Sequence, residues 1–434
     1  MSNPFFYGGP VPPDQFIDRW PELRRIAGRI INHGQSTAIV GEPRSGKTSM
    51  LSYLTSAEAH KKFYGPEGGR LLFCFLDAQT LGGRFGQAQF WEYALRPLQE
   101  RVIVHGPDSP LAQAYELCQK NDFGCFVLER LLAQVGAENW RLVLLLDEFD
   151  VLLHHPVLNS AEFFGGLRSL ASRSRGALVL VIASRHSLTG LNDATQQFSH
   201  TGSPYFNFLD EIVLGALPSK AIAELLLRAG DRFTVDDCHF IEKVAGGHPY
   251  LLQVAASELW EIYAEDQDNL DRRWQRVGQK LYGEATRMLG DTWRLWSPMI
   301  RRAFAAVALA NMDVLGRGRF YTRRSLRDLR DLEPELRLLR VQGFVVEDES
   351  IPGGWRVRPH VFLWWLTDEL VRMVRRGMPL EECLQKQELG ILLTRDEKDQ
   401  WGKVVHAVES LLQDGVKALV EAGVKGILGA MTGA

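Results

Sequence analysis

The segment "GEPRSGKTSM" at residues 41–50 constrains the fold of this chain more than any other stretch. Residues 41–48 fit the pattern G-x-x-x-x-G-K-[ST], which forms a phosphate-binding loop when a strand precedes it and a helix follows it. Residues 37–40 are apolar and β-rich, whereas residues 47–60 place apolar side chains at helical spacing. The alternative is a glycine turn before a core helix, but the filled pattern with both flanks in place favours the phosphate loop.

The residue types in this loop suit a nucleoside triphosphate bound with Mg²⁺. Gly41 and Gly46 let backbone N–H groups turn inward around the β-phosphate without a Cβ clash. Lys47 would reach the β- and γ-phosphates, and Thr48 would ligate Mg²⁺. ATP and Mg²⁺ are the expected ligands. The expected phosphate-binding residues are Gly41, Glu42, Pro43, Arg44, Ser45, Gly46, Lys47, Thr48 and Ser49.

Four later apolar runs have the length of buried strands. They span residues 70–78, 141–153, 176–185 and 210–218. Such runs, separated by helical stretches, indicate a parallel sheet that helices cover on both faces. The predicted fold class is therefore α/β with three layers, and the nucleotide is expected at the carboxyl ends of the strands.

Three acids follow the apolar strand in "LVLLLDEFD", at Asp147, Glu148 and Asp150. An acid at a strand end beside Mg²⁺ holds the water shell of the metal, which is the role predicted for Asp147. Glu148 is the predicted general base that takes a proton from the attacking water. Asp150 is expected to orient its neighbours or to cap the next segment. The alternative is a solvated acidic turn, which the complete phosphate loop upstream makes the weaker interpretation.

The next strand ends in "ASRHS", so that Ser184 and Arg185 lie on the strand expected beside Asp147. An arginine there can report whether the γ-phosphate is present, because a guanidinium–phosphate contact disappears on hydrolysis. The alternative is an arginine in an ordinary surface ion pair. Arg185 is therefore predicted to be a γ-phosphate sensor.

The composition limits the class of protein. The formal net charge of −3 excludes a generally basic nucleic-acid coat, although not a local basic face. The five cysteines are odd in number and form no C-x-x-C pattern, which favours a reducing cytoplasm over disulfides or a zinc site. No signal peptide is recognisable, and the longest apolar runs are too short for a membrane span. We therefore expect a cytoplasmic protein.

Five segments, taken in order, resemble the STAND class of P-loop ATPases, which are signal-transduction ATPases related to AAA+, NACHT and NB-ARC proteins. The segments are "NPF…GPVPPDQFIDRWPEL", "GEPRSGKTS", "LLLDEFD", "ASR" and "GGHPYLL". The likeness is greatest to bacterial AAA-like members and covers about residues 3–370. It implies a P-loop ASCE-type core, a helical lid and a winged helix, and a role in bacterial stress or antiviral signalling.

The resemblance also implies roles for single residues. Pro249 in "GHP" would pack on adenine from the lid, and the same segment also fits a plain helix start. Arg19 and Glu22 occupy their positions in the family pattern F-x-G-R-x-x-E-L, which makes Arg19 a nucleotide-binding residue. Asp18 stands where glycine is usual, so the backbone conformation there is open. His360 is either the family's nucleotide-facing histidine or a structural histidine.

The chain is expected to have four parts. They are an ATPase core at 1–217, a helical lid at 218–293, a winged helix at 294–376 and a helical tail at 377–434 that is amphipathic over 402–432. The winged helix, with helices expected at 298–310, 322–332 and 334–342, holds sixteen arginines and no lysine against ten acids. This mixture is more typical of a solvated or interdomain face than of a DNA-binding stripe. A latch on the core is therefore expected, with DNA binding as the alternative.

Apolar residues recur at helical spacing in the tail, from Val404 to Leu428. The core and the winged helix look complete without this segment, so its apolar face needs another surface. The candidates are docking within the chain, a partner or self-association helix, and a membrane interface. Balanced charge and the lack of an aromatic residue after Trp401 make the membrane the weakest candidate. We expect a tail that is sequestered at rest and recruits a protein effector or another copy after ATP-driven opening.

Three functions share these features. The leading hypothesis is a slow, regulatory ATPase that acts as a switch, in which ATP favours an open or assembled form and hydrolysis resets it. The second is a DNA-handling ATPase of the initiator or transposition-regulator kind, which salt-dependent DNA binding would select. The third is a scaffold without activity. The presence of Lys47, Asp147 and Glu148 makes this hypothesis the weaker one. The sequence does not indicate which stimulus would activate such a switch, because it has no tandem repeats of a sensor type.

Overall fold

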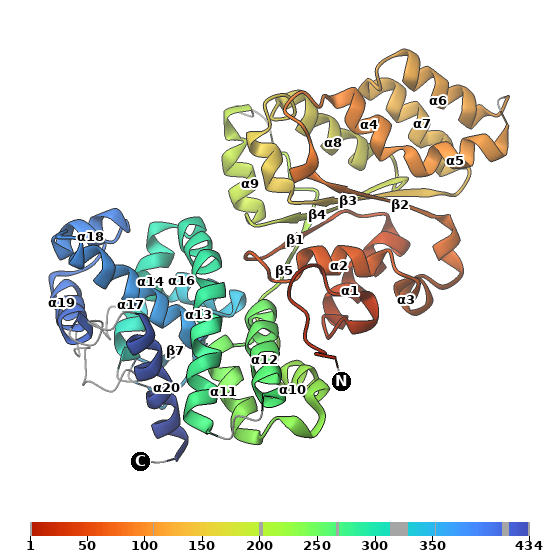
Figure 1. The fold of residues 1–434 in the computed structure, drawn as a ribbon. Helices are drawn as coiled ribbons and strands as arrows, with labels where there is room; N and C mark the ends of the chain where they lie inside the picture. The colour runs from red at the N-terminus through yellow and green to blue at the C-terminus, as the bar shows by residue number, and fades with distance from the viewer. Residues whose placement is uncertain are drawn as a thin grey trace. The chain divides into compact units, whose positions relative to one another are not determined.

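The computed structural model describes residues 2–106, 108–198, 203–265, 269–312, 329–351, 353–409 and 416–432. The chain forms two compact units. The sheet unit comprises residues 10–41 and 46–214, and the helical unit comprises residues 1–9, 42–45 and 215–434. Figure 1 shows the order of the elements along the chain.

Five parallel strands form the sheet of the sheet unit, in the order β2-β3-β4-β1-β5 (Figure 1). The strands are β1 (Thr37–Val40), β2 (Leu71–Asp77), β3 (Arg141–Asp147), β4 (Leu178–Ser184) and β5 (Asp210–Val213). Each strand falls within an apolar run identified from the sequence, because a strand buried on both faces needs apolar residues at successive positions. The predicted α/β fold with a parallel sheet is confirmed.

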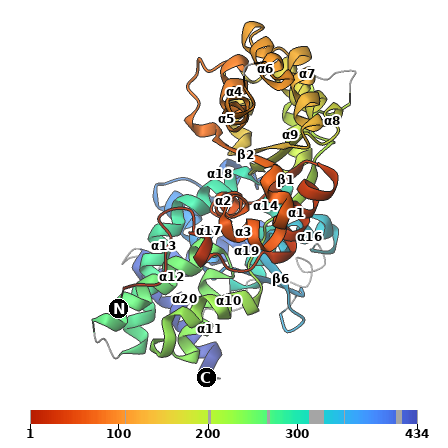
Figure 2. The same ribbon diagram turned by 90° about the vertical axis from the view of Figure 1, so that its right-hand side faces the viewer.

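Helices cover both faces of this sheet, as Figures 1 and 2 show. One face packs on α1 (Trp20–Gly28) and α2 (Lys47–Leu54), with the short α3 (Ala57–Ala59) beside them. The other face packs on α4 (Gln87–Ala94), α5 (Arg96–His105), α6 (Pro110–Lys120), α7 (Cys125–Ala137), α8 (Ala161–Arg173) and α9 (Leu188–Ala194). The unit therefore has the three layers that the apolar runs predict.

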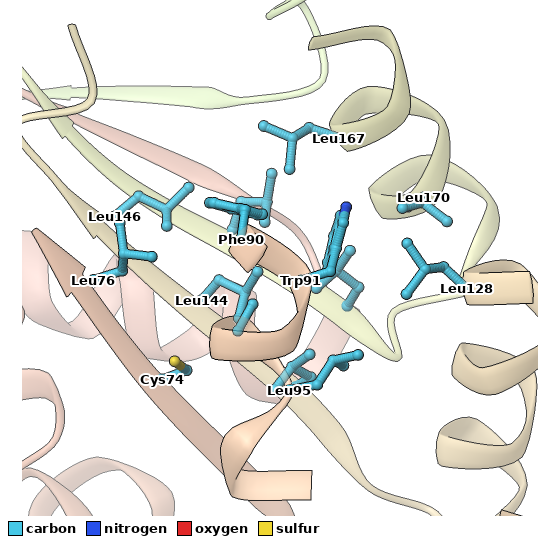
Figure 3. Packing of buried hydrophobic residues seen from close by; sticks show 14 of the residues in the cluster. Cys74, Leu76, Phe90, Trp91, Leu95, Leu128, Leu144, Leu146, Leu167 and Leu170 are labelled. Atoms are coloured by element: carbon cyan, nitrogen blue, oxygen red, sulfur yellow. The ribbon is translucent and has the colours of Figure 1, made fainter. Parts of the chain in front are cut away.

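Alternate side chains of β3 enter two separate cores. Leu144 and Leu146 pack near Phe90 of α4 on one face of the sheet, as Figure 3 shows. Val143 and Leu145 lie in the core beneath α1 and α2. Because both sets are buried, a shift of the strand by one residue would exchange the two cores, so the position of the acid that ends β3 is fixed.

From residue 219 onward, the helical unit consists first of a series of helices. They are α10 (Ser219–Leu226), α11 (Val235–Ala245), α12 (Pro249–Ala264), α13 (Leu270–Leu295), α14 (Pro298–Ala310) and α16 (Glu333–Gln342). An antiparallel hairpin of β6 (Val345–Glu347) and β7 (Trp355–Val357) follows. The order of helix, helix and hairpin agrees with a winged helix. Most of the helix expected at 322–332 lies outside the described residues, so the winged helix stays a prediction.

The remaining helices are α17 (His360–Arg375), α18 (Leu380–Lys386), α19 (Arg395–Glu409) and α20 (Val416–Thr432). The end of the tail docks within the helical unit, because α20 packs against α13 and α17 with Val420 and Val424 buried. Two glycines permit this approach. A Cβ on Gly423 would lie 2.3 Å from Trp364 Nε1, and a Cβ on Gly278 would lie 2.7 Å from Val420 Cγ1. Docking is thus the arrangement seen, and recruitment of a partner stays a prediction.

Candidate nucleotide-binding site

The phosphate loop connects β1 to α2, as the sequence predicts. Gly46 has a φ of +100° immediately before the first residue of α2, a conformation that a side chain would strain. The Nζ atom of Lys47 donates a hydrogen bond of 2.8 Å to the carbonyl oxygen of Gly41. The loop therefore combines backbone N–H groups, a helix N-terminus and a buried ammonium group, which is a combination that binds phosphate.

Asp147 ends β3 close to this loop, because the hydroxyl of Thr48 donates a hydrogen bond to its carboxylate. Burial raises the pKa of Asp147. The bonds from Thr48 and from the N–H of Glu148, together with the charge of Lys47, oppose that increase. A hydroxyl and a carboxylate side by side are oxygen donors of the kind that Mg²⁺ prefers, so the residues present fit a bound Mg²⁺.

Asp77, which sequence reasoning missed, ends β2 in register with Asp147. Its charge adds to the increase in the pKa of Asp147, and its carboxylate accepts a hydrogen bond of 2.9 Å from the N–H of Gln79. An acid at the end of the apolar run 70–78 was visible in the sequence. Only the pairing of β2 with β3 makes it a neighbour of the predicted metal ligand.

Glu148 follows β3 in a left-handed conformation, with a φ of +48°. Such a conformation is uncommon for a residue with a side chain, and strained residues of this kind cluster at functional sites. Burial raises the pKa of Glu148; the charge of Lys47 is the largest opposing influence, and Asp150 raises the pKa further. The Oε2 atom is buried and accepts no hydrogen bond within the described part of the chain. Glu148 is thus a partly desolvated carboxylate beside a lysine, which suits a proton acceptor.

Arg185 directly follows β4 and is anchored by Asp150. Its Nε and Nη2 atoms lie 2.9 Å and 2.8 Å from Asp150 Oδ2, and its backbone N–H donates to Asp150 Oδ1 at 3.0 Å. Burial acts to raise the pKa of Asp150, but the bonds and the charge of Arg185 outweigh it and lower the pKa. Arg185 Nε also lies 3.7 Å from Glu148 Oε2. The arginine is therefore in an ion pair and beside the predicted base at the same time.

The segment that precedes α1 explains how Asp18 replaces the usual glycine. Asp18 and Arg19 both have left-handed backbones, with φ of 59° and 64°. Asp18 therefore adopts the conformation that glycine adopts most easily, and aspartate is among the residues that tolerate it. Arg19 is buried and lies 3.6 Å from Glu22, and its burial lowers the pKa of the guanidinium. Its contact with a nucleotide stays a prediction.

The "GGHP" segment ends α11 and starts α12 in the helical unit. Gly246 and Gly247 have φ of 63° and 89°, and a Cβ on Gly246 would lie 2.6 Å from the Cα of Pro359. Pro249 is the first residue of α12, where proline is favoured. The interpretation as a helix start is confirmed, and the contact of Pro249 with adenine stays a prediction.

His360 is buried at the start of α17. Burial, aided by the positive charges of Lys243 and Arg356, lowers the pKa of His360 to about 4. The imidazole is therefore neutral at pH 7. Its role toward a nucleotide stays a prediction.

Glu42 and Arg44 of the phosphate loop contact other residues of the helical unit. The sequence analysis assigned both residues to phosphate binding alone. The Nε1 atom of Trp296, at the end of α13, donates a buried hydrogen bond of 3.2 Å to Glu42 Oε1. The guanidinium of Arg44 lies 4.1 Å from the centre of the Tyr250 ring on α12. The hydroxyl of Tyr250 in turn donates to Glu284 Oε2 of α13 at 3.3 Å. The loop is thus tied to α13 by two routes.

Three arginines near the expected wing are paired with acids. Arg337 lies 3.0 Å from Glu333 on α16, and Arg340 pairs with Glu347 of β6. Arg356 of β7 lies 3.3 Å from Asp348. Neutralised arginines favour the latch interpretation over a DNA-binding stripe, because binding to phosphates would require these pairs to break.

Within the residues that the structure describes, no cluster of three or more His, Cys, Asp or Glu side chains could hold a metal ion. The five cysteines are free. In the same described ranges, no helix combines the length and the apolar character that crossing a membrane requires.

Comparison with known proteins gives a partial family match. Residues 107–273 match the sequence model of a family described as Novel STAND NTPase 2. This region starts after the phosphate loop and includes β3, β4 and the "GGHP" segment. No curated protein matches the chain.

Solved structures give broad likenesses. The Walker-type ATPase of Pyrococcus abyssi is 16% identical, with a TM-score of 0.48 over 81% of this chain and 96% of that chain. The ORC2 protein of Aeropyrum pernix, in ADPNP–ADP complexes, is 15% identical, with a TM-score of 0.45 over 90% and 95%. A STAND protein with a tetratricopeptide repeat sensor from Pyrococcus horikoshii is 15% identical, with a TM-score of 0.33 over 92% of this chain and 49% of that chain. At these levels of identity, no residue role carries over from them.

Proposed function

We propose that this chain is a STAND-type P-loop NTPase that acts as an ATP-dependent molecular switch, whose ATP and ADP forms differ in what they bind. The observation that carries this proposal lies within the sheet unit. A lysine of the phosphate loop, an oxygen pair suited to Mg²⁺, a half-buried glutamate and an anchored arginine lie at one edge of the sheet. A passive scaffold has no need of this combination.

Binding of ATP would use the loop and its lysine. Lys47 would exchange its hydrogen bond to Gly41 for the β- and γ-phosphates, with backbone N–H groups of residues 41–49 around them. Thr48 and Asp147 would hold Mg²⁺, which when bound neutralises charge on the phosphates. Arg19 and Pro249 are proposed to contact the nucleoside. Pro249→Ala should then weaken ATP and ADP equally, which titration calorimetry measures.

Hydrolysis would use Glu148 as the general base. The oxygen of a water molecule forms a bond to the γ-phosphorus while Glu148 accepts the proton of that water. The bond between the γ-phosphorus and its bridging oxygen breaks, and ADP leaves with the electron pair. The raised pKa of Glu148 brings its proton affinity closer to that needed at neutral pH. We propose a slow reaction that resets the switch.

The contacts at the top of the loop support a route from the nucleotide to the tail. Glu42 and Arg44 connect the loop to α13, directly through Trp296 and indirectly through Tyr250. α13 also carries Gly278, against which α20 packs. A change of loop conformation would therefore reach the surface on which the tail is held. We propose that ATP releases α20, which then recruits a second copy or a protein effector.

We also propose a cellular compartment and a biological role for this switch. Free cysteines support a reducing compartment such as the cytoplasm. A role in bacterial stress or antiviral signalling is proposed from the family alone. The arginines of α16 and of the β6–β7 hairpin are paired with acids, which makes the alternative of a DNA-binding initiator-like ATPase the weaker proposal.

One experiment tests the switch and its alternative together. Particle size is measured by light scattering with and without ATP and Mg²⁺, at low and high salt, with duplex DNA in parallel samples. The switch predicts a change of size that needs ATP and is absent in Lys47→Ala. Lys61→Ala, at an exposed lysine of the same unit, is the matched control. Salt-sensitive binding to DNA without a nucleotide-dependent change of size would instead select the DNA-handling ATPase.

A further inference from the structure

On the basis of the proposed function, we propose that Asp150 is a positioning residue that holds Arg185 in readiness to exchange Glu148 for the γ-phosphate of ATP. Sequence reasoning gave Asp150 only the general task of orienting its neighbours. The structure shows which neighbour it contacts and through which atoms.

The geometry of the pair fixes the arginine at both ends. Asp150 Oδ1 accepts the backbone N–H of Arg185, while Oδ2 accepts Nε and Nη2. Bonds of 2.8–3.0 Å to one carboxylate hold the main chain and one edge of the guanidinium together. Asp150 is only 3% exposed, so solvent does not compete for these bonds. The rotamer of Arg185 is therefore set by Asp150.

The guanidinium of Arg185 lies closer to Asp150 than to Glu148. Arg185 Nε lies 2.9 Å from Asp150 but 3.7 Å from Glu148. The contact with Glu148 is thus an ion pair without a hydrogen bond, and it is the weaker of the two. A γ-phosphate would displace this weaker contact first, because its charge exceeds that of one carboxylate. Arg185 would stay on Asp150 while Glu148 becomes available to accept a proton.

Without Asp150, Arg185 would lose the carboxylate that holds both its backbone N–H and its guanidinium. A guanidinium bonded directly to Glu148 would occupy the carboxylate that is proposed to accept a proton. It would also turn away from the position expected for the γ-phosphate. The bonds from Asp150 therefore keep Arg185 from binding Glu148 directly, and they hold its guanidinium toward the position expected for the γ-phosphate.

The test is the isosteric variant Asp150→Asn, compared with Arg185→Ala and the double variant. We expect ADP affinity within about twofold of the unaltered protein, and a loss of ATP-over-ADP preference of about tenfold, the size of one charge-assisted hydrogen bond. In the Arg185→Ala background, Asp150→Asn should cause no further loss of preference, because residues that act as one unit are not additive. Additive losses, or equal losses of ATP and ADP affinity, would overturn the proposal.

A second variant keeps the test decisive if Asp150→Asn does not fold, which thermal unfolding would reveal. Asp150→Glu restores the charge with a longer side chain, and it should recover most of the ATP preference. Arg185→Lys keeps the charge but loses the two-atom contact, and it should lose the preference as Arg185→Ala does. Failure of the unaltered protein to bind ATP would refute the proposed function itself. Normal turnover and preference in Asp150→Asn would refute only the role of Asp150.

Discussion

The indole N–H of Trp296 donates to the carboxylate of Glu42, a residue 254 positions earlier in the chain. Glu42 occupies a variable position of the phosphate loop, and Trp296 is the first residue after α13. The bond is buried, and both residues belong to the helical unit. A side chain that the phosphate-loop pattern leaves undetermined thus ties the loop to the helix on which the tail rests.

Loss of this bond should uncouple the loop from the tail without removing the nucleotide. Trp296→Phe keeps most of the ring but removes the donor of this buried hydrogen bond, at a cost of about 1–3 kcal/mol in the free energy of unfolding. We expect ATP affinity within a few fold of normal and a loss of the ATP-dependent change of particle size. Trp401→Phe is the control, since the buried Nε1 of Trp401 has no hydrogen-bond partner in the described part of the chain. A Trp296→Phe protein that still changes size with ATP would contradict this coupling.

The phosphate loop and the base should separate binding from turnover. Lys47→Ala should abolish binding of ATP and ADP, because it removes the ammonium group expected to neutralise the β- and γ-phosphates. Glu148→Gln should bind both nucleotides and lose turnover, which traps the ATP form. Calorimetry and phosphate release measure the two effects. Hydrolysis by Glu148→Gln at the normal rate would show that Glu148 is not the base.

Arg185→Ala should change the preference between nucleotides. Only ATP offers a γ-phosphate to the guanidinium, so ADP affinity should stay near normal while ATP affinity falls about tenfold or more. Competition binding with both nucleotides measures the ratio. An equal fall for ADP and ATP would show that Arg185 is held by Asp150 for structural reasons alone.

Two glycines on α13 provide a matched test of tail docking. A Cβ on Gly278 would lie 2.7 Å from Val420 Cγ1, whereas a Cβ on Gly283 would meet nothing within 4 Å. Gly278→Ala should therefore destabilise the docked tail by about 1–3 kcal/mol, while Gly283→Ala should stabilise the helix by roughly 0.5–1 kcal/mol. Limited proteolysis should then cleave α20 faster in Gly278→Ala only. Equal cleavage in both variants would mean that this contact does not hold the tail.

Deletion of residues 402–434 extends that test. The shortened chain should keep most ATP hydrolysis and lose assembly or partner capture, because the proposed catalytic residues lie in the sheet unit. Size-exclusion chromatography and phosphate release measure these two properties. Aggregation of the shortened chain, or loss of nucleotide binding, would show instead that α20 is part of the core of the helical unit.

His360 should make stability depend on pH in mildly acidic solution. Its pKa is about 4 in the folded chain and about 6.5 in an unfolded one, so the unfolded state binds more protons between these values. The free energy of unfolding should therefore rise as the pH increases from 4 to 6.5, by an amount on the order of 3 kcal/mol, and this contribution should be constant above. Urea unfolding of His360→Gln should show a smaller slope in this range. An unchanged slope would assign the effect to other groups.

The sequence predicted those features that depend on local pattern. Apolar runs located the strands, and the rule that ligands bind at the carboxyl ends of parallel strands brought Asp147 and Arg185 to one edge of the sheet. Asp77 was missed because its position beside Asp147 depends on strand order, which a single run does not reveal. The contact of Glu42 with Trp296 was missed for a stronger reason, since no local pattern links residues so far apart. Asp18 stands where the family pattern has glycine, and its backbone is left-handed, a conformation that glycine adopts easily.

The chain passes between its two units at residues 9–10, 41–42, 45–46 and 214–215, so the phosphate loop is divided between them. A fragment that ends at residue 214 would keep every residue of the loop but would lack the partners of Glu42 and Arg44. Such a fragment could fold as a sheet with its helices and still present an incorrectly ordered loop. The side chains of Glu42 and Arg44 therefore depend for these contacts on Trp296 and on Tyr250 of α12, which such a fragment lacks.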